Sequence, residues 1–254
     1  MRYVCVFAHQ DDEMRCLGTL LRLREQGHVV AFIAVTAGDK GLPFADRADQ
    51  HRAATVREAE MRRVAAAFDA AYLCLGREDG FVYDDARLRR DMIAALRSVR
   101  PDVVFTHWTT EYNDDHQVTA KAVTDAALFT NLSSFEPNAP AIDQVPRILY
   151  VDPGPGYGFE ATHFVELTDH HARRKAELIR VHASQMDVMR TLRGHDYADE
   201  MADADRMTGA RLMTTYAEGF RPCLAERRIP WPSDLPGRLD QPGAGSPAGD
   251  SREG

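Results

Sequence analysis

The sequence has few cysteines, no excess of basic residues and no long hydrophobic run, and each of these absences excludes a class of protein. Its four cysteines are scattered without a C-x-x-C pair, which excludes a disulfide scaffold and favours reduced, structural thiols. Lysine and arginine together number 31 against 39 aspartates and glutamates, a formal net charge of -8. That balance offers no footprint for nucleic acid or for an anionic membrane surface, so we expect neither as a partner.

The apolar run nearest the start of the sequence, residues 3–8, is much shorter than the roughly 20 residues of a membrane-spanning helix and too short for a signal peptide. We therefore expect a cytoplasmic protein. The composition, 44% hydrophobic and 28% charged, is typical of a globular chain, and 254 residues suit one large α/β domain. We assign residues 1–229 to this domain and residues 230–254, rich in proline and glycine and without periodicity, to a mobile tail.

Runs typical of buried strands alternate with amphipathic helices along the chain. Residues 3–8 and 29–35 are strand-forming runs, with apolar residues at helical spacing between them. Two strands joined through a helix are parallel, which favours an α/β fold with a doubly wound, mainly parallel sheet of the Rossmann-like type. Further strands are expected at residues 71–75, 103–106, 147–151 and 164–167, and further helices at 56–68, 88–99, 117–130, 168–182 and 208–219.

In such a sheet, ligands bind outside the carboxyl ends of the strands, so the loop after the first strand is of interest. It reads A-H-Q-D-D-E, residues 8–13. An acidic pair before a helix, with glutamate close behind, is typical of helix capping, and this structural interpretation stays open for Asp11 and Asp12. His9 is harder to explain in that way, because histidine is the commonest metal-binding side chain and carboxylates complete such sites.

A second polar group, residues 111–116, follows the strand expected at 103–106. Alone, a loop of this kind is typical of solvated surface. Because both loops follow parallel strands, they can bring His9, Asp12 and His116 to one ion at the carboxyl edge of the sheet. Two imidazoles and one carboxylate suit Zn²⁺, and three protein ligands leave the fourth position open for water, as in a catalytic site.

These motifs resemble those of a known family. The A-H-Q-D-D-E segment is similar to the A-H-P-D-D-E signature of the LmbE-like, or PIG-L, zinc-dependent N-acetylglucosaminyl deacetylases, with Gln10 in place of the usual proline. The similarity covers most of residues 1–220. It also includes Gly18-Thr19, Gly27-His28, Thr36-Ala37-Gly38, Arg57 with Glu60, Asp79-Gly80, residues 100–102 leading to His107, Asp115-His116, Lys175 and residues 182–185.

The resemblance implies a division of roles among the clustered residues. It implies that His9, Asp12 and His116 hold zinc, and that Asp11 is the general base. Adjacent side chains point in different directions, so one carboxylate can bind the metal while the other faces the metal-bound water. Zinc lowers the pKa of that water toward about 7, so that Asp11 can take its proton as hydroxide attacks the amide carbonyl.

The resemblance also indicates residues that contact the substrate. Arg57 would grip sugar hydroxyls or a phosphate, and Asp79 would accept a hydrogen bond from a sugar hydroxyl. Tyr112 would contact the tetrahedral intermediate, and His107 lies at the end of the strand that leads to the second motif. Structural alternatives stay open for Arg57 as a solvated helix residue, for Asp79 as part of an Asp-Gly turn and for Tyr112 as a packed loop residue.

The second motif departs from the family pattern at Asn113. The family usually has histidine at this place, which is thought to stabilise the intermediate or protonate the amine, whereas asparagine can donate a hydrogen bond but has no proton to give near pH 7. Either Asp11 carries the proton alone, or another group such as His107 replaces the histidine. Asp115 loses the imidazole that it normally orients, and we expect it to support a metal ligand instead.

These observations favour a zinc-dependent hydrolase that removes an N-acetyl or other N-acyl group from an amino-sugar conjugate or a sugar-containing secondary metabolite. Its partner would be a small N-acylated glycoside, and a homo-oligomer is compatible with the sequence. Two alternatives stay open. One is a non-catalytic protein that binds zinc and sugar, and the other is a zinc hydrolase of another amide or of an ester.

Overall fold

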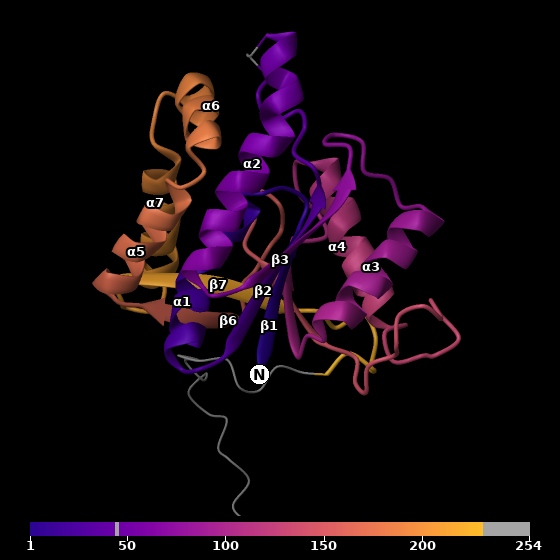
Figure 1. Ribbon diagram of the computed structural model, residues 1–254. Helices are drawn as coiled ribbons and strands as arrows, with labels where there is room; N and C mark the ends of the chain where they lie inside the picture. The colour runs from indigo at the N-terminus through magenta and orange to yellow at the C-terminus, as the bar shows by residue number, and fades with distance from the viewer. Residues whose placement is uncertain (44–45, 231–254) are drawn as a thin grey trace, which may run out of the picture.

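The structure, a computed structural model, describes residues 1–43 and 46–230. Its centre is a seven-stranded sheet in the order β3-β2-β1-β4-β5-β7-β6, with helices on both faces (Figure 1). The strands are β1 Arg2–Phe7, β2 Val29–Thr36, β3 Ala71–Arg77, β4 Val103–Thr106, β5 Arg147–Val151, β6 His163–Leu167 and β7 Tyr216–Pro222. The helices are η1 Asp12–Arg15, α1 Leu17–Glu25, α2 Arg47–Ala67, α3 Ala86–Val99, α4 Asp114–Ala127, α5 Asp169–Ile179, α6 Ala183–Arg193 and α7 Tyr197–Ala210.

The first five strands form the parallel part of the sheet that the sequence predicts. β1 pairs in parallel with both β2 and β4, so that Tyr3 lies between Val30 and Val103. β2 pairs in parallel with β3, and β4 pairs in parallel with β5. The doubly wound α/β architecture is therefore confirmed, and β1 and β4 lie side by side at its centre.

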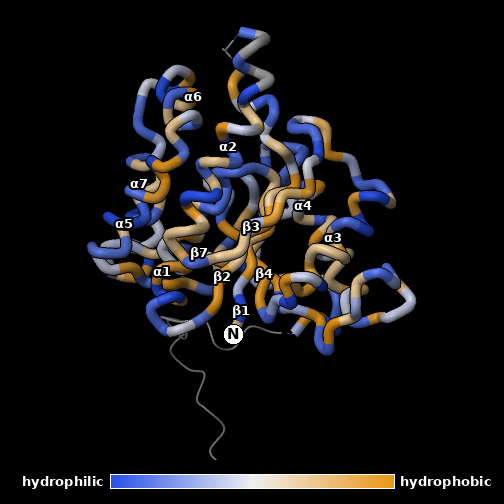
Figure 2. The backbone as a smooth tube through the Cα atoms, in the orientation of Figure 1, coloured by the Kyte–Doolittle hydropathy of each residue, from blue (hydrophilic) through white to orange (hydrophobic). Residues whose placement is uncertain are grey.

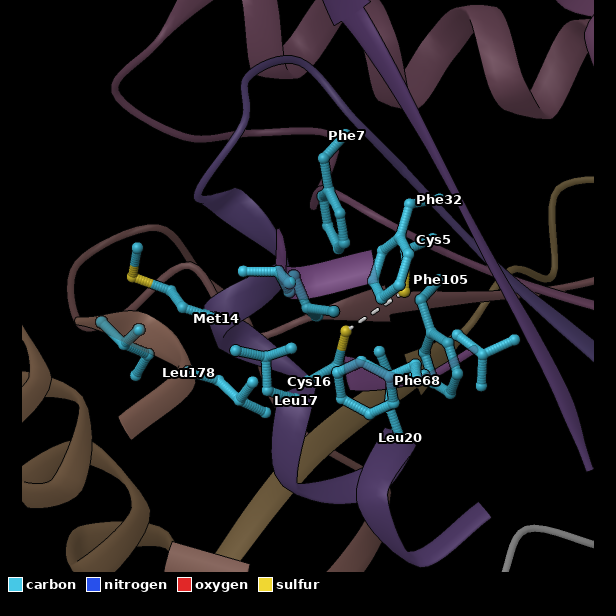
Figure 3. Close-up of a cluster of buried hydrophobic side chains, with 14 of the residues drawn as sticks. Cys5, Phe7, Met14, Cys16, Leu17, Leu20, Phe32, Phe68, Phe105 and Leu178 are labelled. Atoms are coloured by element: carbon cyan, nitrogen blue, oxygen red, sulfur yellow. Dashed lines mark hydrogen bonds between the residues drawn. The ribbon is translucent and has the colours of Figure 1, made fainter. Parts of the chain in front are cut away.

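Two apolar clusters hold the helices against the faces of the sheet, and the hydrophobic segments gather at the centre in Figure 2. One cluster includes side chains of α1, α2, α5 and α7, and the other includes those of α3 and α4. Figure 3 shows the first cluster, in which Cys5 and Cys16 lie among aromatic and aliphatic side chains. Their Sγ atoms are 3.6 Å apart and both thiols are free, as the sequence predicts for structural cysteines.

The carboxyl-terminal part of the domain differs from the sequence prediction. The helix expected at 208–219 is wrong, because α7 ends at Ala210 and β7 begins at Tyr216. β7 lies between β5 and β6 and is antiparallel to both. The turn before it packs closely on α7, where a Cβ on Gly209 would lie 2.8 Å from backbone atoms of residues 214–216. The helix expected at 168–182 is α5, which ends at Ile179, and the prediction missed α6 and most of α7.

A buried charged residue explains why β7 does not look like a strand in the sequence. Glu218 is 2% exposed, and its carboxylate accepts hydrogen bonds from the backbone N–H groups of Gly18 and Thr19 at the start of α1, at 2.9 and 2.7 Å. Lys175 of α5 lies 2.7 Å from Glu218 and 2.7 Å from Asp205 of α7. Burial, opposed by the attraction of Lys175, raises the pKa of Asp205 to about 7. This network joins α1, α5, α7 and β7.

We expect Lys175→Met to destabilise the fold by about 3–5 kcal/mol, because it removes the cation that pairs with two buried carboxylates. Urea unfolding measures the effect. Arg174→Met is the matched control on the same helix, because Arg174 pairs with Glu177 at the surface and its loss should cost less than about 1 kcal/mol. Equal unfolding free energies of the two variants would contradict this role for Lys175.

No helix in residues 1–43 and 46–230 is both long enough and apolar enough to cross a membrane. The tail expected at residues 230–254 lies, from residue 231 on, outside the described residues. The division of the chain into a domain and a tail therefore stays a prediction.

Candidate metal centre and active site

The candidate site lies where β1 and β4 end side by side. β2 and β3 continue the sheet on one side of this pair and β5 on the other, so the winding reverses here, which is where α/β sheets bind ligands. His9 and Asp12 follow β1, and His116 lies in the first turn of α4. His9 Nδ1 is 3.1 Å from His116 Nε2 and 3.2 Å from Asp12 Oδ2, while His116 Nε2 is 3.4 Å from Asp12 Oδ1.

Carboxylates fix the tautomer of both imidazoles. His9 Nε2 lies 3.1 Å from Asp79 and 3.3 Å from Asp115, and His116 Nδ1 lies 2.9 Å from Glu111. Because an ionised carboxylate only accepts, these nitrogens carry the N–H. Burial opposes the charge of His9, but the carboxylates around it raise its pKa well above the usual value, so His9 must lose the proton on Nδ1 to bind a metal. Burial lowers the pKa of His116, which favours its neutral form. Two imidazole nitrogens and a carboxylate thus converge on one point.

This donor set fits zinc. Tetrahedral ligands at about 2.0–2.1 Å from zinc are separated from one another by about 3.3 Å. The three donor–donor distances, from 3.1 to 3.4 Å, match that spacing. Two neighbouring acid–histidine groups have similar spacing, namely His107, Glu111 and His116 on one side and His9, Asp79 and Asp115 on the other. In both groups, however, the carboxylates accept hydrogen bonds from imidazole N–H groups and so orient the rings.

Asp11 lies beside these ligands in a strained conformation. Its φ of 132° is one that residues with a side chain rarely adopt, and such strain typically costs about 1–3 kcal/mol and is found at functional sites. Its Oδ1 accepts a hydrogen bond of 2.8 Å from Arg57 Nη2. Burial raises the pKa of Asp11 to about 6, although the Arg57 guanidinium opposes the shift.

Arg57 is held from three sides. It is 3% exposed, donates to the backbone carbonyl of Gln10 at 2.8 Å and lies 3.3 Å from Asp79. Gly38 and Gly41 of the loop after β2 leave room for it, since a Cβ on Gly41 would clash with Arg57 Nη1. The interpretation of Arg57 as a solvated helix residue is therefore wrong. Asp79, which the sequence also placed at the substrate, joins Arg57 to His9.

Asn113 and Asp115 form the amino-terminal end of α4. Asn113 is the N-cap, and its Oδ1 accepts a hydrogen bond of 2.9 Å from the backbone N–H of Asp115. The Asp115 carboxylate accepts hydrogen bonds from the backbone N–H groups of Gly80 and Val82 at 2.7 and 3.0 Å. Burial raises its pKa, but these bonds and the one to His9 outweigh burial and lower the pKa overall. Asp115 thus stays ionised beside His9.

His107 has partners at both ring nitrogens. Its Nε2 accepts a 2.9 Å hydrogen bond from the backbone N–H of Ala8, and its Nδ1 lies 3.3 Å from Glu111. Its ring stacks on that of His116, with centroids 3.9 Å apart. A narrow cleft over the metal site is lined by His107, His116 and Tyr112. Tyr112 is 60% exposed, with its ring edge-on to His116.

The sequence interpretation missed residues that orient the site. Glu111 binds both His107 and His116; burial opposes its charge, but these two hydrogen bonds lower its pKa to about 2. Glu13 accepts from the backbone N–H of Asp11 at 3.0 Å and pairs with buried His182 at 2.6 Å. Glu111 is close in the sequence to both His107 and His116, so its contact with them could have been predicted. His182 and Glu13 are far apart in the sequence, so their contact could not.

Residues 4–127 match the family described as PIG-L: GlcNAc-PI de-N-acetylase. This segment belongs to the PIG-L family. It contains all of the residues assigned above to the metal centre and its surroundings except His182. The resemblance of the two acid–histidine motifs to this family is therefore confirmed.

Several solved structures share the fold of this chain. N,N'-diacetylchitobiose deacetylase from Pyrococcus horikoshii is 22% identical, with a TM-score of 0.75 over 87% of this chain and 83% of that chain. The A40926 pseudoaglycone deacetylase is 17% identical, with a TM-score of 0.67 over 91% and 99%. The 4-carboxy-2-hydroxymuconate hydratase GalB from Pseudomonas putida KT2440 is also 17% identical, with a TM-score of 0.76 over 89% and 97%. At these identities the likeness establishes the fold.

Proposed function

We propose that the protein is a zinc-dependent hydrolase that removes an N-acetyl group from an amino-sugar conjugate or a sugar-containing secondary metabolite. The convergence of His9 Nδ1, His116 Nε2 and the Asp12 carboxylate at 3.1 to 3.4 Å carries the proposal, because it presents a three-donor site beside a second carboxylate. Membership of the PIG-L family over residues 4–127 and the deacetylases among the similar structures support the choice of an N-acetylated amino sugar.

Each residue of the site has a separate task in this proposal. His9, Asp12 and His116 would hold Zn²⁺, which, when bound, lowers the pKa of water and polarises an amide carbonyl. Asp11 is the general base, because its carboxylate is close enough to Asp12 and His9 for their charges to act on it, and its pKa, raised to about 6, leaves it ionised but basic near neutral pH. Arg57 holds Asp11 in place.

We propose that Asp11 also returns the proton to the leaving amine. Asn113 uses its carbonyl oxygen as the helix cap and has no titratable proton. His107 accepts from the Ala8 backbone and is held by Glu111, so neither of its nitrogens is free to act. Of the two alternatives that the sequence left open at the family's histidine position, this geometry favours proton transfer by Asp11 alone.

The test is acetate release from a panel of N-acetylglucosamine conjugates by the purified, zinc-loaded protein. We expect release that is lost after chelation and in the Asp11→Asn variant. Stoichiometric zinc binding without release from any conjugate would reject hydrolysis of these amides and favour a protein that binds zinc and sugar. Release of a different acyl group or cleavage of an ester would favour the alternative of a zinc hydrolase that acts on another amide or on an ester. GalB is a hydratase with the same fold, so fold alone does not decide the reaction.

Substitution of Asn113 separates its capping role from contact with the reacting amide. We expect Asn113→Ser, which keeps an N-cap acceptor, to change stability little and to leave kcat/KM within about tenfold of wild type. Asn113→Ala should lose about 1 kcal/mol of unfolding free energy, measured in urea. A loss of about 100-fold in kcat/KM for Asn113→Ser would instead assign the carboxamide N–H to the tetrahedral intermediate.

A further inference from the structure

A cavity larger than the cleft over the metal site adjoins that cleft. It measures about 250 Å³ and lies between α7, β7 and the loop that follows β5. The narrow cleft over the metal site and this cavity share one wall residue, Arg15 of η1. The loop after β5 separates them, with Pro153 lining the cleft and Gly154 lining the cavity. A group attached to a substrate at the metal site can therefore enter the cavity past Arg15.

The walls of the cavity combine apolar side chains with a few charged ones. The apolar part includes side chains of Pro155, Phe159, Met201 and Met207. Such a lining favours a mainly apolar organic group, and the space is far greater than the roughly 10–15 Å³ that one water needs.

Most charged groups of the cavity are already paired. Lys175, Asp205 and Glu218 are 3%, 6% and 2% exposed and satisfy one another. Asp152 accepts from the backbone N–H of Gly154, and the Arg211 guanidinium lies 5.6 Å from the centre of the Phe164 ring. These groups form structure rather than a free binding surface.

Arg15 differs from them. Its side chain is half-buried, and among residues 1–43 and 46–230 it makes no hydrogen bond or ion pair, although its charge acts on the Asp205 carboxylate beyond ion-pair distance. Its Nη1 lies 4.0 Å from the Cβ position of Gly154, at the loop between cleft and cavity. Withdrawing a guanidinium from water without a partner is costly, and its planar fork matches the two oxygens of a carboxylate or phosphate.

We propose that this cavity is a subsite for the part of the substrate beyond the amino sugar, and that Arg15 binds an anionic oxygen group, carboxylate or phosphate, on that mainly apolar part. The inference rests on the proposed function, since it places the amide of the same substrate at the metal site. It makes Arg15 a specificity-determining residue that touches the substrate away from the reacting atoms.

Calorimetric binding of three aryl glucosaminides tests the subsite without turnover, because they have no acetyl group to lose. The aryl group is neutral, para-carboxylated or para-phosphorylated. We expect one anionic ligand or both to bind about 10- to 100-fold more tightly than the neutral one, as charge-assisted hydrogen bonds predict. The tighter of the two identifies the anion. Arg15→Gln should abolish the preference, with folding checked by its melting temperature.

Arg90→Gln is the matched control, because Arg90 is exposed on α3, across the sheet from the cavity, and its loss changes the net charge equally. It should keep the preference. Equal binding of all three ligands to the wild type, or a preference that survives Arg15→Gln, would overturn the proposal. Acetate release from the N-acetylated forms is measured in parallel. Anion preference without any release would reject the proposed function alone, whereas release without anion preference would reject the subsite alone.

Discussion

His9→Ala and His116→Ala should each weaken zinc binding by more than about 100-fold and abolish measurable acetate release. The reason is that each removes one of three donors, whereas loss of a residue that only orients a ligand typically costs about 10- to 100-fold. Among the described residues, His9 and His116 occur together only in the group with Asp12. Each of the other two acid–histidine groups contains just one of them. Zinc content after dialysis against a graded chelator series measures the effect.

Glu111→Gln and Asp79→Asn are the matched controls, because each removes a carboxylate that orients one of these histidines while leaving the donors in place. We expect an intermediate loss of zinc affinity, about 10- to 100-fold. If Glu111→Gln or Asp79→Asn released zinc as completely as His116→Ala and His9→Ala do, one of the neighbouring groups would be the metal site instead.

Asp11→Asn should retain stoichiometric zinc and lower kcat/KM by about 10²- to 10⁴-fold, the usual contribution of a general base. Asparagine is close in size to aspartate and can still meet Arg57, but it cannot accept a proton. The result separates Asp11 from its neighbour Asp12, whose loss should release the metal. Full activity of Asp11→Asn would end the assignment of Asp11 as base.

The same assignment fixes the sign of the pH dependence. Asp11 must be ionised to accept a proton, so kcat/KM should fall tenfold for each pH unit below its pKa. That pKa is raised to about 6 by burial, and a bound cation lowers it, so the acid limb of the pH profile of kcat/KM should lie near or below pH 6.

The Arg57 guanidinium opposes the upward shift of the Asp11 pKa. Arg57→Met should therefore move the acid limb to higher pH, while Arg57→Lys, which keeps the charge, should move it less. A limb that does not move in Arg57→Met would show that Asp11 is not the titrating group.

The parallel part of the sheet and the candidate metal site could be predicted from local sequence alone. Apolar runs and helical periodicity predicted the strands of the parallel part of the sheet and the helices between them, because burial of one face imposes a repeat that can be read within a short window. The placement of His9, Asp12 and His116 followed from the same pattern, since polar residues at the ends of adjacent parallel strands share one edge. Two motifs were therefore enough to predict the metal centre.

Other features depend on contacts between distant parts of the chain. Glu218 is a strand residue only because Lys175 and the start of α1 satisfy its charge, so β7 could not be distinguished from a helix by pattern. The roles of Asp79 and Asn113 were likewise decided by what they touch, His9 and Arg57 in one case and the Asp115 backbone in the other.

The sequence by itself thus determined the parallel part of the sheet and the helices between its strands, and it predicted which residues would hold a metal, because each depends on residue types at local spacing. Only the tertiary structure decided which nitrogen of each histidine faces the site, which residues hold Asp11, and that Arg15, between the site and a second cavity, has no hydrogen bond or ion pair to the part of the chain that the structure describes. The physical reason is that burial and hydrogen bonding depend on what the rest of the chain brings alongside a residue, and no local period encodes that.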